Sequence, residues 1–268
     1  MKEFFENLLK GTVIGSSMLL PGVSGGTTAI ILGIYDKIIA AVSSFFRHPK
    51  HNLVFLCAVI AGGLFGMLAF SKGLLYVTET YPMPMHYLFI GAILGSIPLL
   101  IKKSTIRQIT PKAFFYPVIG AVLVLILELL PENLFVFSEL TGPADYLLLF
   151  TAGLITAVAL VLPGLSVSFM LLVLGIYEPT LQAIGTMNLA FLLPLLISVC
   201  IGIVASTKLL GTAMARHPQG TFLIIAGFVL ASLKSVYPGL PTGMNIPICL
   251  GAFAAGLTGI LFVSKFSD

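Results

Sequence analysis

Residues 21–35 read PGVSGGTTAIILGIY, and residues 163–177 read PGLSVSFMLLVLGIY. Over the 16 positions that end in Asp36 and Glu178, the two copies are identical at seven: Pro, Gly, Ser, Leu, Gly, Ile and Tyr. A match at a fixed offset, here 142 residues, is the mark of an internal repeat. The motif therefore predicts two related halves, residues 1–134 and residues 140–268.

Outward from the motif, the similarity weakens but continues. Gly62 aligns with Gly202, Gly91 with Gly227, and Gly120 with Gly251. Each half holds five apolar segments: residues 4–20, 24–45, 53–77, 86–101 and 113–130 in the first, and 145–162, 166–184, 189–214, 221–236 and 246–263 in the second. Several approach the roughly 20 residues that a helix needs to cross a bilayer.

The composition supports a membrane protein. Apolar residues make up 58% of the 268 residues, and Asp, Glu, Lys and Arg only 9%, against about a quarter in soluble domains. So few charges exclude a water-soluble enzyme and a nucleic-acid-binding protein. The apolar runs are continuous rather than alternating, which argues against an outer-membrane barrel. We expect an all-α polytopic membrane protein.

A helix break separates the first two apolar segments of each half. The breaks fall at Pro21-Gly22 and Pro163-Gly164, because proline lacks the backbone N–H and glycine accepts almost any backbone angle. No charged loop flanks either break, which favours a re-entrant hairpin that stays within the membrane. Two full spans joined by a tight turn are the alternative.

The basic residues predict the orientation. With the N-terminus in the cytoplasm, 12 of the 14 Lys and Arg residues lie on the cytoplasmic side, and only Lys72 and Lys234 do not. The C-terminus is then cytoplasmic as well. Each half makes an odd number of net crossings, so the second half is inverted relative to the first. Inverted repeats with broken helices are a common plan of secondary transporters.

The residues after each break predict an anion site. A helix that begins there presents unpaired N–H groups, to which hydroxyls and glycines add donors and space for a ligand. The candidate substrate-binding residues are Ser24, Gly25, Gly26, Thr27, Thr28, Ser166 and Ser168. The alternative is that the glycines serve helix packing and that the hydroxyls bond back to the chain.

Three ionisable residues are further candidates. Lys208 lies within an apolar segment, where it either assists the anion from the cytoplasmic side or extends to the membrane interface. Asp36 and Glu178 occupy equivalent positions and could couple transport to protons or sodium; the alternative is that they end a helix at the interface. We expect no catalytic residue, because no histidine base accompanies Ser24, and no metal or cofactor.

The paired motifs resemble a bacterial family long known only as a domain of unknown function, whose members are described as polyprenyl-phosphate transporters. The resemblance covers almost the whole chain and both motifs in order. It implies a plasma-membrane protein that returns undecaprenyl phosphate, the lipid carrier of cell-wall synthesis, from the outer to the inner leaflet. Val167 departs from the family, whose second motif often has glycine there. Two other functions stay open, a secondary transporter of a small soluble anion and a membrane-embedded lipid-phosphate enzyme.

Overall fold

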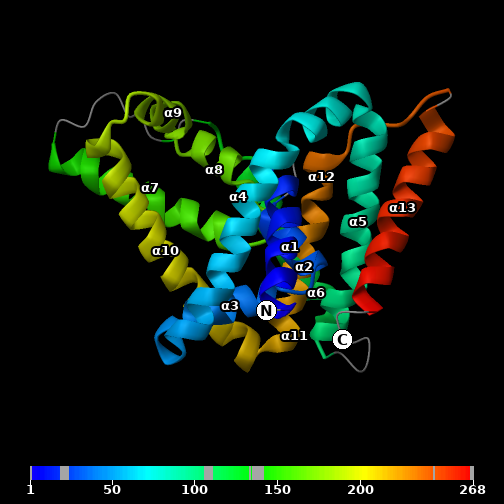
Figure 1. Cartoon of the computed structure of the whole chain (residues 1–268), viewed down its shortest axis with the longest axis horizontal. Helices are drawn as coiled ribbons and strands as arrows, with labels where there is room; N and C mark the ends of the chain where they lie inside the picture. Colours follow the sequence, from blue (N-terminus) through cyan, green and yellow to red (C-terminus); the bar gives the residue numbers. More distant parts are fainter. Residues whose placement is uncertain are drawn as a thin grey trace.

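The computed structural model describes residues 2–18, 24–105, 111–132, 134, 142–243 and 245–265, and these residues are all-helical (Figure 1). The first half contains α1 (Lys2–Ser17), α2 (Gly25–Ile31), α3 (Tyr35–Ser43), the 3₁₀ turn η1 (Phe45–Arg47), α4 (Pro49–Thr80), α5 (Pro82–Lys103) and α6 (Pro111–Glu128). The second contains α7 (Pro143–Val161), α8 (Val167–Val173), α9 (Tyr177–Gly185), α10 (Leu189–Arg216), α11 (Pro218–Ala231), α12 (Leu233–Val236) and α13 (Asn245–Lys265).

Six stretches of the described chain are long and apolar enough to cross a membrane: α4, α5, α7, α10, α11 together with α12, and α13. The number rises to eight if each of two bent helix pairs counts as one span. Many side chains of these helices are large, apolar and exposed, for example Leu68 and Leu209. A soluble protein would bury such a surface, whereas lipid tails can cover it. The prediction of an all-α polytopic membrane protein is therefore confirmed.

The second apolar segment of each half consists of two helices with a sharp bend between them. The axes of α2 and α3 meet at 115°, and those of α8 and α9 at 106°. The bends fall at Gly33 and Gly175, whose φ angles are +68° and +72°. At Gly33 the N–H bonds to Ile30 O at 2.9 Å and the next N–H bonds to Ala29 O at 3.0 Å, which is a Schellman cap. The repeated Leu-Gly-Ile-Tyr is thus a helix stop.

The Pro-Gly break in the second half is also present. Helix α7 ends at Val161 and α8 begins at Val167, with Pro163 and Gly164 between them. Gly164 has φ +84°, and a Cβ there would lie 2.4 Å from the carbonyl oxygen of Phe228. Only glycine satisfies both constraints. The corresponding Pro21 and Gly22 lie outside the described residues.

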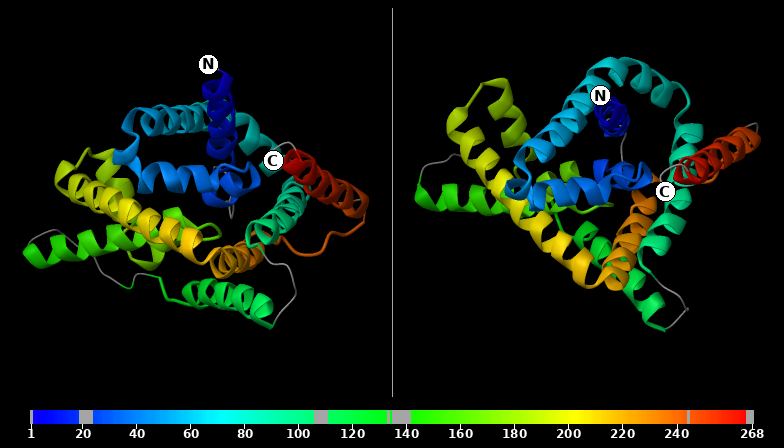
Figure 2. Two further views of the ribbon diagram at one scale, coloured as in Figure 1. Left: turned by 90° about the horizontal axis from the view of Figure 1, so that it is seen from below. Right: turned by 60° about the horizontal axis from the view of Figure 1, so that its bottom comes forward.

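Four close helix pairs build the molecule: α1 with α4, α7 with α10, α5 with α13, and α6 with α11. Figures 1 and 2 show α5 and α13 side by side although they lie far apart in the sequence. Glycines permit such close packing in two of the pairs. Gly91 of α5 lies against Phe253 O of α13, and Gly227 of α11 lies against Pro117 O of α6. The packing does not support the alignment of Gly120 with Gly251, since a Cβ added at Gly251 would meet no atom of another element within 4 Å. Gly256, which faces Leu88 O, is the counterpart of Gly120.

Helix α11 contributes side chains to two buried clusters. Its Ile225, Ala226 and Val229 join one buried cluster with α2 and α3. Its Phe228 and Ala231 join a second buried cluster with α8 and α9. Each bent pair therefore belongs to a buried cluster that includes residues of α11, and Gly164, which precedes α8, lies directly against Phe228 O of this helix.

The contacts of the two bent pairs differ. Helix α3 packs against α10, whereas α9 makes no comparable contact with α4 within the described residues. In Figure 1, α3 lies near the ends marked N and C, and α9 lies at the opposite end of the molecule. The assembly is therefore closed at the end where α3 lies and looser at the end where α9 lies.

Candidate functional site

We call residues 24–26 the first tip and residues 163–166 the second tip, because each leads into a short helix at the molecular centre. Ser24 is the N-cap of α2 and accepts a hydrogen bond from Thr27 N at 3.2 Å. Its hydroxyl oxygen also accepts one from Gly164 N of the second tip at 3.4 Å. The Ser24 hydroxyl therefore joins the two halves of the chain, and it also lies 3.4 Å from the hydroxyl of Thr27.

The second tip has the same local structure. Ser166 is the N-cap of α8 and accepts from Phe169 N at 3.3 Å. The tips also touch through Gly26, where a Cβ would lie 3.1 Å from Pro163 Cα. The two tips therefore meet, and Gly26 leaves room for that contact.

A large apolar cavity of about 850 Å³ lies beside the tips. Its walls come from α1, α2, α3, α4, α7, α8 and α10 and consist mostly of Ile, Leu, Val, Ala and Met side chains. Both tips contribute to the lining, through Ser24, Gly25, Gly26 and Ser166, and Ser168 of α8 adds a hydroxyl. This space suits an apolar chain that carries one polar group at the tips.

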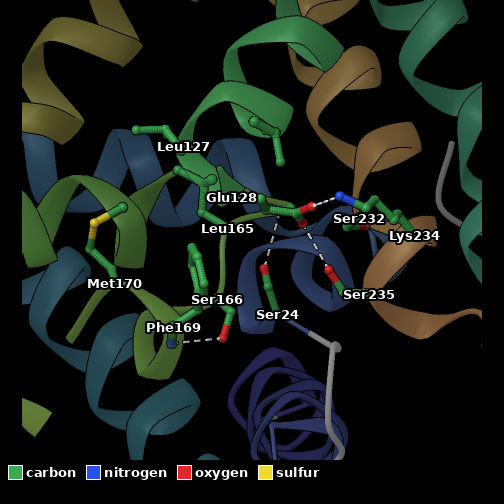
Figure 3. Close-up of a pocket in the computed structure, with 12 residues that line it drawn as sticks. Ser24, Leu127, Glu128, Leu165, Ser166, Phe169, Met170, Ser232, Lys234 and Ser235 are labelled. Carbon is green, nitrogen blue, oxygen red and sulfur yellow. Dashed lines mark hydrogen bonds and ion pairs between the residues drawn. The ribbon is translucent and has the colours of Figure 1, made fainter. Parts of the chain in front are cut away.

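A smaller cavity of about 300 Å³ lies next to the large one and is more polar (Figure 3). Ser24, Leu165, Ser166 and Phe169 line both cavities, so the tips form their common wall. The rest of the small cavity is lined from α6, α8 and α12, together with Ser232, the N-cap residue of α12. An apolar cavity and a somewhat more polar one thus meet at two serine hydroxyls.

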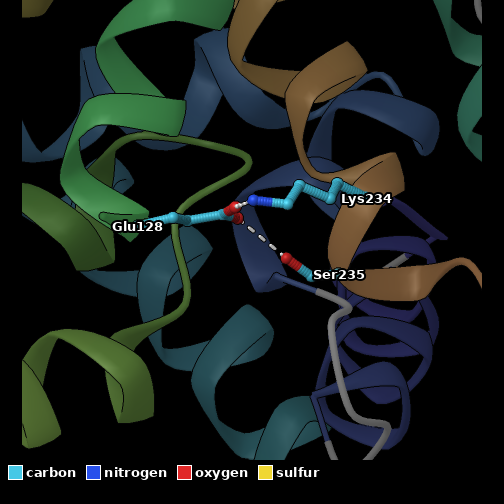
Figure 4. Close-up of polar contacts among 3 residues, drawn as sticks. All are labelled: Glu128, Lys234 and Ser235. Carbon is cyan, nitrogen blue, oxygen red and sulfur yellow. Dashed lines mark hydrogen bonds and ion pairs between the residues drawn. The ribbon is translucent and has the colours of Figure 1, made fainter. Parts of the chain in front are cut away.

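The small cavity also holds an ion pair that the sequence analysis missed (Figure 4). Glu128, the last residue of α6, accepts from Lys234 Nζ at 3.1 Å and from Ser235 Oγ at 2.9 Å. Lys234 is the one cation among the described residues that line either cavity. A signal was available, because Lys234 was one of two basic residues that broke the charge rule.

Residues 14–246 match the family described as VCA0040-like, undecaprenyl phosphate translocase-like. The chain belongs to this family. It is 36% identical over 255 residues to a polyprenyl-phosphate transporter of Staphylococcus aureus, which covers 91% of this chain and 90% of the relative. It is 28% identical over 252 residues to a polyprenyl-phosphate transporter of Vibrio cholerae, which covers 88% of this chain and 78% of the relative. No solved structure matches the chain.

In this undecaprenyl phosphate translocase-like chain, the two candidate threonines lie behind the first tip. Thr27 and Thr28 are buried, and neither is among the residues that line the two cavities described above. The Thr28 hydroxyl lies 2.7 Å from that of Ser17 in α1 and donates to Ser24 O at 3.3 Å. In this conformation the threonines anchor the tip, while Ser24 and Ser166 face the cavities.

The structure does not bring the charged candidates to the tips. Lys208 is exposed on α10 and lines neither cavity, although its neighbour Thr207 lines the large one. Asp36, in the first turn of α3, forms an ion pair with Lys103 at the end of α5. Glu178, in the first turn of α9, is exposed. Acidic side chains in a first helical turn also stabilise the helix dipole.

Proposed function

We propose that this chain moves undecaprenyl phosphate from the outer to the inner leaflet of the bacterial plasma membrane. Both curated relatives are polyprenyl-phosphate transporters and match nearly the whole chain. The observation that carries the proposal is the pair of adjoining cavities, one lined mostly by apolar side chains and one that also holds an ion pair, with the tip serines between them. An amphipathic lipid has the same division into an apolar tail and an anionic head.

The phosphate needs polar partners wherever it leaves water. Burying an unpaired ion in hydrocarbon costs many kcal/mol, whereas each hydrogen bond to a charged group returns about 1.5–3 kcal/mol. Ser24 and Ser166 are placed to donate such bonds, and Gly25 and Gly26 leave room at the first tip. The larger cavity takes the first isoprene units, and the rest of the tail stays in lipid.

We further propose that the two halves are inverted repeats, residues 1–134 and 140–268, related by a pseudo-two-fold axis in the membrane plane. The packing supports this arrangement. Exchange of the halves turns the α1–α4 contact into α7–α10, and the α5–α13 contact into α11–α6. The pairs α3–α10 and α9–α4 would also exchange, yet among the described residues α3 packs against α10 while α9 makes no comparable contact with α4. Such an asymmetry is expected of a transporter in one conformation of its alternating-access cycle, in which one side is closed and the other is open.

The orientation follows from the charges. We place both chain ends in the cytoplasm, and the start of α1 and the end of α13 do lie at the same end of the molecule (Figure 1). The end of α6, where Glu128 and the small cavity are found, then lies toward the outer leaflet. A polar pocket on that side is suited to take the head group from the outer leaflet. Asp36 and Glu178 stay as candidates for proton or sodium coupling.

The test is a binding comparison on purified protein in lipid nanodiscs. Undecaprenyl phosphate should bind, undecaprenol should bind at least tenfold more weakly because it lacks the charge, and inorganic phosphate should compete only at far higher concentration because it lacks the tail. Equal binding of inorganic phosphate and the lipid would support a transporter of small anions instead. Release of inorganic phosphate from the lipid by the pure protein would indicate an enzyme.

A further inference from the structure

The carboxylate of Glu128 is bound by two donors in the small cavity. One oxygen accepts from Lys234 Nζ at 3.1 Å, and the other accepts from Ser235 Oγ at 2.9 Å (Figure 4). The Glu128 side chain is only 18% exposed, whereas that of Lys234 is 61% exposed. The carboxylate is thus the enclosed partner, and the lysine approaches it from the open side.

This arrangement of donors matches what a phosphate group needs. An ammonium and a hydroxyl, side by side on the short helix α12, grip two oxygens of one anion. A phosphate monoester also presents two or three equivalent oxygens and binds lysine as a point charge. The hydroxyls of Ser24 and Ser166 line the same cavity and could reach the remaining oxygens (Figure 3).

Charge makes the two anions competitors. Lys234 is the one cation among the described residues of the cavity walls, so it cannot neutralise a carboxylate and a phosphate together. Two like charges a few ångströms apart in a partly dry site repel each other by several kcal/mol. A phosphate that enters the cavity must therefore take Lys234 from Glu128.

We propose that Lys234 and Ser235 form the cationic half of the head-group site, and that Glu128 occupies this site as an internal anion until the lipid phosphate replaces it. Binding is then an anion exchange. This inference rests on the proposed function, because it assigns residues to the same head group. It also gives the site selectivity, since an uncharged polyprenol cannot displace the carboxylate.

A purely structural ion pair would behave differently. An exposed lysine–carboxylate pair contributes little to fold stability, and loss of either partner then has a similar, small effect. In an exchange site, loss of the lysine and loss of the carboxylate charge change the affinity for the lipid phosphate in opposite directions. Removal of the lysine removes the ligand of the phosphate, whereas removal of the carboxylate charge removes its competitor.

The experiment measures undecaprenyl phosphate binding to protein in nanodiscs for Lys234→Met, Glu128→Gln and the double variant. Lys234→Met should weaken binding about tenfold or more, as expected for one lost charge-assisted contact. Glu128→Gln should tighten binding roughly three- to tenfold. In the double variant the lysine is lost as well, so its affinity should fall below that of Glu128→Gln; it should not fall below that of Lys234→Met, because the competing carboxylate charge is gone too. Lys72→Met, which removes an exposed lysine outside both cavities, is the matched control and should bind as the unaltered protein does.

Each outcome has one meaning. Wild-type protein that binds the lipid phosphate no better than undecaprenol would contradict the proposed function itself. If the unaltered protein binds the lipid phosphate while Glu128→Gln and Lys234→Met both weaken that binding, the ion pair is structural and the proposed anion exchange is wrong. The double variant leaves neither charge of the pair without its partner, so it can be compared with Glu128→Gln even if Lys234→Met alone fails to fold. Inorganic phosphate that competes equally in every variant would place the head group elsewhere.

Discussion

Replacement of Tyr35 by Phe tests how the first bent helix pair is held. The Tyr35 hydroxyl donates to Val161 O at 2.9 Å, and its side chain is only 3% exposed. Val161 is the last residue of α7, and the helix breaks at Pro163, so this carbonyl has lost its helical donor. The bond therefore ties α3 of one half to the broken end of α7 in the other.

The cost of the change can be worked from this geometry. Tyr35→Phe keeps the ring but leaves a buried carbonyl without a partner, which costs about 1–3 kcal/mol. For a chain of this size, 1 kcal/mol moves the melting temperature by roughly 2–4 °C. We expect Tyr35→Phe to melt several degrees below the unaltered protein. Tyr177→Phe is the matched control, because Tyr177 has the same motif position but no hydrogen-bond partner for its hydroxyl among the described residues.

The assay is thermal unfolding in mild detergent, followed with a thiol-reactive dye. Cys249 is fully buried, whereas Cys57 and Cys200 are exposed. In a Cys57→Ser, Cys200→Ser background the dye therefore reports the exposure of Cys249. If Tyr35→Phe and Tyr177→Phe melt at the same temperature, the hydrogen bond from Tyr35 to Val161 does not hold the first bent helix pair in place, and the reasoning fails.

Two further substitutions test the tips and the lysine of α10. Gly26→Val should lower lipid transport about tenfold or more, because the valine side chain would push against Pro163 of the opposite tip. Gly25→Val should cause a smaller loss, because the nearest atom there belongs to the flexible Met18 side chain. Equal losses at the two glycines would show that the contact between the tips is unimportant. Lys208→Met should leave affinity within about twofold, since this side chain lies outside both cavities; a tenfold loss, about 1.4 kcal/mol, would make it a head-group ligand.

The sequence revealed the helices because apolar length is a local property. The observed α10, Leu189–Arg216, lies within two residues of its predicted segment, 189–214. The break before Val167 was also local, since Pro163 and Gly164 act on their own backbone. The bend at Gly33 was missed although its signal was local too. A glycine after an apolar run is a common helix stop, but within a membrane segment a glycine is more readily interpreted as a residue for close helix packing.

The site was only partly visible in the sequence. Ser24 and Ser166 could be found because each follows a helix break within one motif. The pairing of Glu128 with Lys234 could not, because 106 residues separate them and the contact depends on how α6 packs beside α11. Thr27 and Thr28 carry the same hydroxyl as Ser24 but face the interior, and only the phase of α2 determines that.

Transport by purified protein in liposomes tests the central claim most directly. Labelled undecaprenyl phosphate is placed in one leaflet, and its appearance in the other is followed for the unaltered protein and for the Ser24→Ala, Ser166→Ala double variant. We predict rapid transfer by the unaltered protein, at least tenfold slower transfer by the double variant, and none of undecaprenol. Transfer no faster than in protein-free liposomes would contradict the account, as would a double variant that transports at the full rate.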